Sequence, residues 1–199
     1  IEIDDLLYAH LCQRFSERKN IDLIHGDVLN VDLPPYDKVV SNIPYSISGP
    51  LLEKVFFREN PPEGILTIES ALADRIFHEQ GTYKNLSRIT ITTNAFLIPS
   101  EREFISSHSF YPAPKISLSL VKLLPMDPFH PFLSTKEQRE FFLDFVAGVM
   151  PYKNKNLVNA LMYHFKRKSS IQLGKPEIRN VLRMNHVGKS KLASLEPQQ

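Results

Sequence analysis

Four consecutive residues, Asn42 to Tyr45, follow an apolar run and combine residue types that can hold a nucleobase. Pro44 has no N–H and keeps Ile43 out of the helical region, so the Ile43 carbonyl is left free to accept a hydrogen bond. The amide oxygen of Asn42 is a second acceptor, and two acceptors match the two hydrogens of an exocyclic amine. Holding both hydrogens would localise a lone pair that is otherwise delocalised into a purine ring, and Tyr45 could stack on the base. A strand-end turn with an inward-packed aromatic explains the tetrapeptide about equally well.

Two acids follow other predicted strands. Ligands of open parallel sheets bind at the carboxyl ends of the strands, where Glu2 and Asp27 are expected. Glu2 is placed to accept both ribose hydroxyls of a nucleoside-containing cofactor, and Asp27 is placed to accept an adenine amine. Each acid also has a plainer interpretation, as a solvated residue near the chain start and as part of a common Gly-Asp turn. Taken singly, the plainer interpretations are favoured.

Alternating strands and helices must position these residues. The sequence predicts helices over about 4–19, 47–57, 70–80 and 85–94. It predicts the end of a strand over 1–4 and further strands over 21–24, 38–41, 63–68, 95–105 and 115–124. Asp4 or Asp5 would cap the first helix, and the last two strands would pair antiparallel at the sheet edge. This rhythm predicts an α/β fold with a mostly parallel sheet and helices on both faces.

Charge is divided unevenly along the chain. Residues 1–150 carry 14 Lys and Arg against 20 Asp and Glu, a net −6, whereas residues 151–199 carry 10 against 2, a net +8. Between them, "LLPMDPFHPF" has three prolines in ten residues and predicts a linker before a helical, basic segment. Blocks such as "PYKNKNLVNALMYHFKRK" supply the charge that neutralises phosphates. The tail alone favours nucleic acid only slightly, because a solvated helix face is the commoner explanation.

Bulk properties exclude several classes of protein. No apolar run approaches the roughly 18–20 residues that cross a bilayer, so we expect no membrane role. One cysteine, Cys12, permits no internal disulfide and argues against a Cys-based zinc site. The histidines lack metal-ligand spacing, so no metal is expected. A reducing, cytoplasmic compartment fits this composition.

Five motifs, in this order and spacing, resemble one known family. The segments "IEID", "GDVLNVD", "VVSNIPYSIS", "ALADRI" and "FYPAPKISLSLVKL" are similar to those of the small-subunit ribosomal RNA adenine dimethyltransferases and the related erythromycin-resistance methyltransferases. The resemblance covers nearly all of residues 1–124 and is weaker over the tail. It implies a Rossmann-like fold dependent on S-adenosylmethionine, with a small C-terminal α-helical domain. It also implies dimethylation of the exocyclic amines of two adjacent adenines in a small-subunit rRNA hairpin loop, coupled to ribosome assembly.

The resemblance also implies the site residues. The family's Asn-(Leu/Ile)-Pro-Tyr motif matches Asn42, Ile43, Pro44 and Tyr45, and its second stacking aromatic matches Phe110. Cofactor contacts are expected from Glu2, Ile3, Asp27, Val28 and Asn42. RNA contacts are expected from Lys153, Lys155, Lys166, Arg167 and Lys168. The implied reaction is direct displacement at a methyl carbon, with no metal and no covalent enzyme intermediate.

The resemblance predicts two domains and a longer protein. A Rossmann-like methyltransferase domain is expected over residues 1–124, and a linker with a basic helical RNA-binding domain over 125–199. A glycine-rich first loop should lie about twenty residues before the ribose acid, as in related nucleotide folds. The sequence begins at that acid, with Ile1. We therefore expect that the first strand and this loop are missing and that these residues alone do not methylate RNA.

Three other functions remain open at this point. One is methylation of large-subunit rRNA of the antibiotic-resistance type, and the Pro-rich linker and basic tail modestly favour the small-subunit type instead. Another is a noncatalytic rRNA-binding assembly factor, for which an intact Asn42–Tyr45 motif would be unnecessary. DNA adenine methylation usually brings Asp or Asn before Pro-Pro-Tyr, whereas this chain has Ile43-Pro44. We expect a monomer that acts on a pre-30S-type particle.

Overall fold

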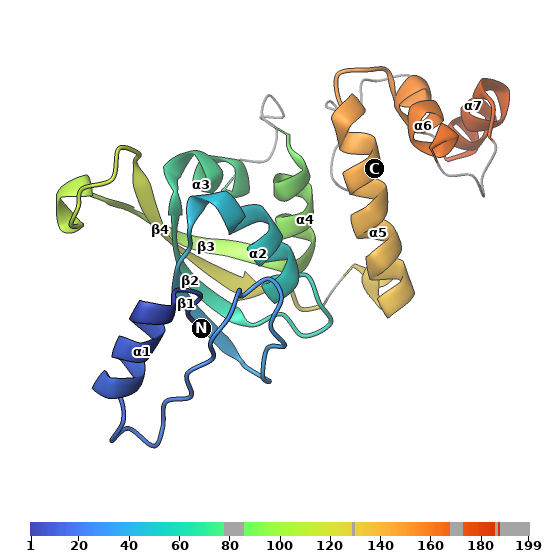
Figure 1. Ribbon diagram of the computed structural model, residues 1–199. Helices are drawn as coiled ribbons and strands as arrows, with labels where there is room; N and C mark the ends of the chain where they lie inside the picture. Colours follow the sequence, from blue (N-terminus) through green and yellow to red (C-terminus); the bar gives the residue numbers. More distant parts are fainter. Residues whose placement is uncertain (78–85, 129, 168–172, 186, 188–199) are drawn as a thin grey trace.

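A four-stranded mixed sheet forms the centre of the molecule. The computed structural model describes residues 1–77, 86–128, 130–167, 173–185 and 187 (Figure 1). The strands β1 (Lys38–Asn42), β2 (Glu63–Glu69), β3 (Leu97–Ile105) and β4 (Leu118–Pro125) lie in the order β1-β2-β4-β3. Of these four described strands, only β1 and β2 pair in parallel. The expectation of a mostly parallel sheet is wrong for the described residues, because β3 and β4 are joined without the crossover helix that parallel neighbours need.

Three helices cover one face of this sheet: α2 (Ser48–Phe56), α3 (Ser70–Ile76) and α4 (Arg88–Phe96) (Figure 1). Alternate residues of the strands pack against these helices in one core. The strands contribute Leu66, Ile68, Val121 and Leu123, and the helices contribute Leu52, Phe56, Ile76 and Phe96. On the other face Val40 is 80% exposed. The expected helices on both faces are therefore not found among the described residues.

Local capping explains where these helices begin. The predicted helix over 47–57 is confirmed as α2, preceded by a 3₁₀ turn at Tyr45–Ile47. The helix α4 begins three residues after its predicted start, because the Ser87 side chain accepts from the Thr90 N–H and caps it. Residues 78–80 and 85 of the predicted helices lie outside the described residues.

The N-terminal region agrees with the prediction only in part. The helix α1 (Asp5–Arg14) begins at the predicted cap, where the Asp4 carboxylate accepts from the Leu7 N–H at 2.8 Å. It ends before the expected Lys19, since no apolar residue follows Phe15 within that segment to continue the helical pattern. The predicted strand over 21–24 is wrong: the Ile24 carbonyl accepts from the Glu2 N–H, but the one parallel bridge here joins Glu2 to His25, just after the segment, and no ladder forms.

Three further helices follow β4: α5 (Lys136–Val149), α6 (Leu157–Lys166) and α7 (Lys175–Met184). Thr135 and Gln138 form a capping box at the start of α5. The antiparallel pairing of β3 and β4 is confirmed, and β4 extends to Pro125, so the predicted linker begins inside the sheet.

The helical part is packed on the sheet part. Figure 1 shows α5 beside α4, with α6 and α7 beyond the end of α5. Buried Arg139 donates from Nη2 to Glu59 Oε2 at 3.1 Å, and the Lys153 ammonium donates to the Leu86 carbonyl at 2.7 Å. The division at residue 124 stays a prediction, and these contacts join the two sides of it.

Candidate active site

The Asn42–Tyr45 segment lies where β1 ends. Asn42 is the last residue of β1, in register with Thr67 of β2, and the Ile43 N–H donates to the Thr67 carbonyl at 3.1 Å. The Ile43 side chain is 2% exposed and belongs to the core, which anchors the backbone there. Among the described residues, no hydrogen bond reaches the Ile43 carbonyl oxygen or the Asn42 side chain. Two acceptors therefore stand unused at this edge.

Tyr45 extends this edge into solvent. Pro44 is extended, with φ −60° and ψ 131°, and Tyr45 opens the 3₁₀ turn that leads into α2. The Ser48 hydroxyl donates to the Tyr45 carbonyl at 3.1 Å, which fixes the backbone. Tyr45 is 43% exposed, so its ring is accessible from solvent.

Phe110 lies on the connection between β3 and β4, which leaves the sheet at the same edge. Glu69 at the end of β2 is in register with Leu118, which is also in register with Ile105. The Ser70 N–H donates to the Ser117 carbonyl at 2.9 Å and ties this connection to the start of α3. In the described part of the chain, the Phe110 and Tyr45 rings are not stacked on each other.

Glu2 and Asp27 are brought together by one backbone turn. Glu2 donates to the Ile24 carbonyl at 3.0 Å, and Gly26 donates to the Glu2 carbonyl at 2.9 Å. Gly26 has φ +148°, and a Cβ there would lie 2.6 Å from Val31 Cγ1, so glycine is required on two counts. The Asp27 carboxylate accepts from the Leu29 N–H and from the Asn30 amide, which holds it in place.

The other expected cofactor residues take different positions. Ile3 is 65% exposed, and its neighbour Glu2 accepts the Asp4 N–H on Oε1 at 2.9 Å. Val28 is partly buried against the core. The structure thus gathers Glu2, Ile3, Asp27 and Val28 around one turn, separate in sequence from the Asn42 segment.

Lys54 joins these two parts of the site, a contact that was not predicted from the sequence. From α2, its ammonium donates to the Leu29 carbonyl at 3.0 Å and to the Val31 carbonyl at 2.6 Å. The turn that carries Asp27 is thereby tied to the helix that follows Tyr45. A lysine on the polar side of a predicted helix gives no sign of such a contact, because its partners are backbone atoms.

Replacement of this lysine tests the tie. We expect Lys54→Met to lower the free energy of unfolding by about 1–3 kcal/mol, because two partly buried carbonyls lose a charged donor. Urea denaturation measures the change. The control is Lys38→Met, which removes an exposed lysine paired with Glu63 and should stay within about 0.5 kcal/mol. Equal effects of the two substitutions would contradict the tie.

The basic residues expected to bind RNA lie away from this edge. Lys153 and Lys155 lie just before α6. Lys166 is its last residue, and Arg167 is its C-cap. The Lys155 ammonium lies 5.3 Å from the centre of the Tyr163 ring, which itself stacks on Tyr152. Lys168 lies outside the described residues. Tyr163 was not singled out from the sequence, where it reads as one more aromatic of an amphipathic helix.

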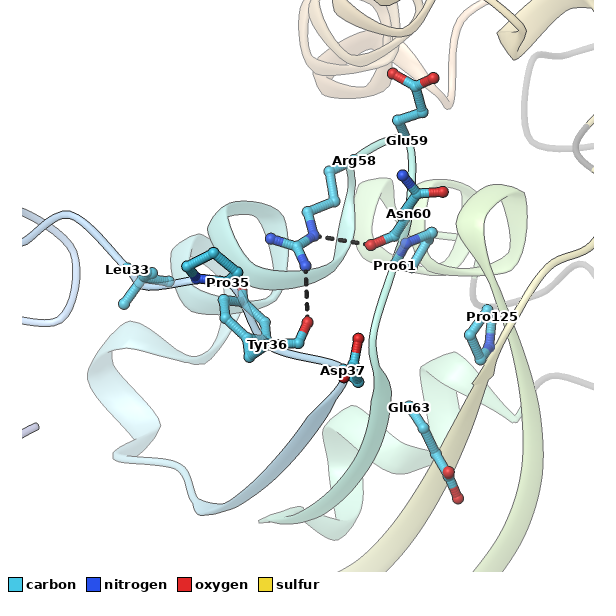
Figure 2. A pocket seen from close by; sticks show the side chains of 10 residues that line it. All are labelled: Leu33, Pro35, Tyr36, Asp37, Arg58, Glu59, Asn60, Pro61, Glu63 and Pro125. Atoms are coloured by element: carbon cyan, nitrogen blue, oxygen red, sulfur yellow. Dashed lines mark hydrogen bonds between the residues drawn. The ribbon is translucent and has the colours of Figure 1, made fainter. Parts of the chain in front are cut away.

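Two grooves on the described structure carry opposite charges. One, of about 730 Å³, lies at the amino ends of β1 and β2 and is lined by three carboxylates, from Asp37, Glu59 and Glu63, and one cation, Arg58 (Figure 2). Arg58 lies over the Tyr36 ring at 4.3 Å; burial raises the pKa of Tyr36, and the guanidinium opposes that rise. The acidic groove thus lies at the end of β1 opposite to Asn42.

The second groove, of about 750 Å³, lies between α2 and the start of α4. Its lining includes three cations, Lys54, Arg75 and Arg88, and one carboxylate, Glu53. Within the described ranges, no cluster of His, Cys, Asp and Glu is suited to a metal ion, and no helix is long and apolar enough to cross a membrane.

The sequence and the fold both match known proteins. The sequence matches the family described as ribosomal RNA adenine dimethylase over residues 1–196. The chain belongs to this family. The predicted resemblance is thus confirmed, including over the tail, where the motifs were weak.

Two proteins with similar sequences are named as small-subunit rRNA methyltransferases. The "Probable ribosomal RNA small subunit methyltransferase A" of Methanosarcina mazei is 36% identical over 182 residues, which is 92% of this chain and 63% of the relative. The "Ribosomal RNA small subunit methyltransferase A" of Borrelia garinii is 29% identical over 172 residues, 84% of this chain and 59% of the relative. The chain thus spans less than two thirds of the length of either relative.

Two solved structures confirm the fold class. A dimethyladenosine transferase from Plasmodium falciparum superposes with a TM-score of 0.74 at 22% identity, over 98% of this chain and 76% of that one. The 23S rRNA methyltransferase ErmE gives a TM-score of 0.59 at 21% identity, over 98% and 75% of the two chains. The family member described here therefore has an α/β, Rossmann-like methyltransferase fold.

Proposed function

We propose that the protein transfers methyl groups from S-adenosylmethionine to the exocyclic amines of adenines in small-subunit rRNA. One observation carries the proposal: the unused Ile43 carbonyl and Asn42 side chain lie beside the exposed Tyr45 ring. An aminopurine needs such a pair of acceptors and a stacking face, whereas an RNA-binding surface alone does not. The names of the relatives support small-subunit rRNA as the substrate.

The residues around the Gly26 turn suit a nucleoside cofactor. Glu2 retains an oxygen, Oε2, that accepts no hydrogen bond from a described residue, and this oxygen can receive ribose hydroxyls. The Asp27 carboxylate is held by two donors from its own turn and keeps lone pairs for an adenine amine. Ile3 and Val28 offer apolar contacts beside these acids. When bound, S-adenosylmethionine supplies a methyl group on a positively charged sulfur.

Positioning and electrostatics are the contribution of the protein to this reaction. Tyr45 on one side and Phe110 on the other hold the extruded base by stacking. Asn42 and the Ile43 carbonyl each accept one hydrogen of the amine, so its lone pair leaves conjugation with the ring and turns toward the methyl donor. The amine loses its surplus proton to water, which requires no side-chain base. Neutral acceptors suit this task, because a carboxylate would bind the donor's positive charge and oppose transfer.

The finer parts of the proposal concern the setting. Two adjacent adenines of one hairpin loop would each receive two methyl groups, within an assembling small-subunit particle in the cytoplasm. The protein would act as a monomer. Residues 151–199, which carry a net charge of +8 and include α6, would bind the surrounding rRNA.

Transfer of labelled methyl groups tests the proposal. The longest chain that the gene encodes is incubated with labelled S-adenosylmethionine and either immature small-subunit particles or naked large-subunit rRNA. We expect label in the small-subunit rRNA alone. Label in large-subunit rRNA would favour the antibiotic-resistance type of enzyme, and tight rRNA binding without transfer would favour an assembly factor.

A further inference from the structure

The cationic groove between α2 and α4 holds none of the side chains assigned to the target adenine or the cofactor, although Leu29 of the Gly26 turn lines it. Its near wall begins at Gly49 and Pro50, one turn of chain after Tyr45. Its far wall is the start of α4, at Ser87 and Arg88. The groove, of about 750 Å³, is open to solvent along its length.

The charges of this groove select an anion. Arg75 reaches it from α3, where its Nε donates to the Ala71 carbonyl at 3.1 Å, and in the described structure it forms no ion pair. Arg88 is held across the groove by an ion pair with Glu53, and its side chain remains 45% exposed. A guanidinium has several N–H donors, so a carboxylate partner leaves some of them for a phosphate.

Lys54 contributes charge without being a free ligand. Two of its three hydrogens are taken by the Leu29 and Val31 carbonyls. Its positive charge is nevertheless fixed at the wall of the groove, and the N-terminal end of α4 adds a partial positive charge on the other side. The groove thus carries three cations against the one carboxylate of Glu53.

The groove also lies on a route to the basic helical part. Leu86 directly precedes Ser87, and its carbonyl holds the Lys153 ammonium at 2.7 Å. Lys155 follows two residues later, over the exposed Tyr163 ring. The segment that begins α4 therefore borders the groove and also contacts Lys153, just before α6. The acidic groove at the opposite edge would repel the same strand (Figure 2).

We propose that this groove binds a backbone phosphate of the RNA strand that carries the target adenine, through Arg75 and Arg88. The inference rests on the proposed function, which it extends from the base to the flanking strand. A phosphate fixed here sets where the neighbouring nucleotide enters the pocket between Tyr45 and Phe110. Arg75 and Arg88 are then RNA-positioning residues, which act on binding rather than on the methyl-transfer step.

A pairing of protein and RNA changes tests this contact. The probe is the small-subunit rRNA hairpin, with single phosphates beside the target adenines replaced by uncharged methylphosphonates on 2′-deoxynucleotides. We expect Arg75→Gln with Arg88→Gln to weaken hairpin binding about tenfold at 0.1 M salt. At one or two positions, the uncharged linkage should weaken binding of the unmodified protein similarly, yet leave binding of the double variant unchanged.

Controls separate this contact from folding and from the proposed function. Arg18→Gln removes an exposed arginine far along the chain from the groove and should leave hairpin affinity unchanged. Arg75→Lys should restore part of the affinity, since it keeps the charge. Additive losses from protein and RNA changes at every position would overturn the proposal. Binding is measured without methyl donor, so a protein that binds the hairpin but never methylates it would sink the proposed function and leave this test readable.

Discussion

Asn42→Ala should reduce methyl transfer to rRNA by roughly 10²-fold in kcat while leaving rRNA affinity nearly unchanged. The expectation follows from the position of the side chain, which ends β1 and accepts no hydrogen bond from a described residue. An acceptor of this kind acts on the amine as its lone pair is freed, and contributes little to holding a large RNA. Steady-state rates with saturating rRNA and filter-binding affinities measure the two quantities separately.

The matched control is Asn60→Ala. Asn60 is an exposed asparagine in the acidic groove, where its backbone carbonyl, not its amide, accepts from Arg58 (Figure 2). This variant should keep both rate and affinity. Equal losses of rate and affinity in Asn42→Ala would mean that the side chain binds RNA, and the proposed role in activating the amine would be wrong.

Removing positive charge around α6 should instead weaken rRNA binding and leave the methyl-transfer rate nearly unchanged. Replacement of Lys155, Lys166 and Arg167 by Gln removes three cations at the two ends of α6. If each meets one phosphate, the slope of log affinity against log salt becomes shallower by about 2, at about 0.7 per contact with single-stranded RNA. The rate at saturating rRNA should hold, because none of the three lies at the edge that carries Asn42.

Lys153 is left unchanged in that experiment because its ammonium already holds the Leu86 carbonyl. The control is a triple Gln variant at Lys19, Lys38 and Lys136, which are exposed and lie outside the basic tail. A salt slope that changes equally in both triple variants would assign the effect to overall charge, and an unchanged slope would move the RNA surface elsewhere.

Local sequence signals predicted the elements that depend on neighbouring residues. Asp4 caps α1, the apolar run before Asn42 forms β1, and the segments on either side of Phe110 pair as antiparallel strands. Each of these depends on capping, periodicity or turn residues that lie within the segment itself. The placement of Asn42 and Phe110 at one edge follows from them.

The errors arose where the outcome depends on distant partners. Residues 21–24 have strand-like types, but the backbone pairs in parallel with Glu2 at one bridge alone, at His25, so no strand forms. Lys54 and Arg139 read as surface charges, yet one holds two carbonyls of the cofactor turn and the other is buried against Glu59. The charge of a groove built from α2, α3 and α4 likewise appears only after these helices are packed together.

Nucleoside mass spectrometry of the methylated rRNA tests whether Asn42 and the Ile43 carbonyl direct methyl transfer to the adenine amine. Small-subunit particles are treated with S-adenosylmethionine and either the unmodified protein or Asn42→Ala, and the rRNA is digested to nucleosides. We expect N6,N6-dimethyladenosine with the unmodified protein, and little or none with the variant. Methylation at any other atom, or equal dimethylation by both proteins, would contradict the assignment of Asn42 and the Ile43 carbonyl to the target amine.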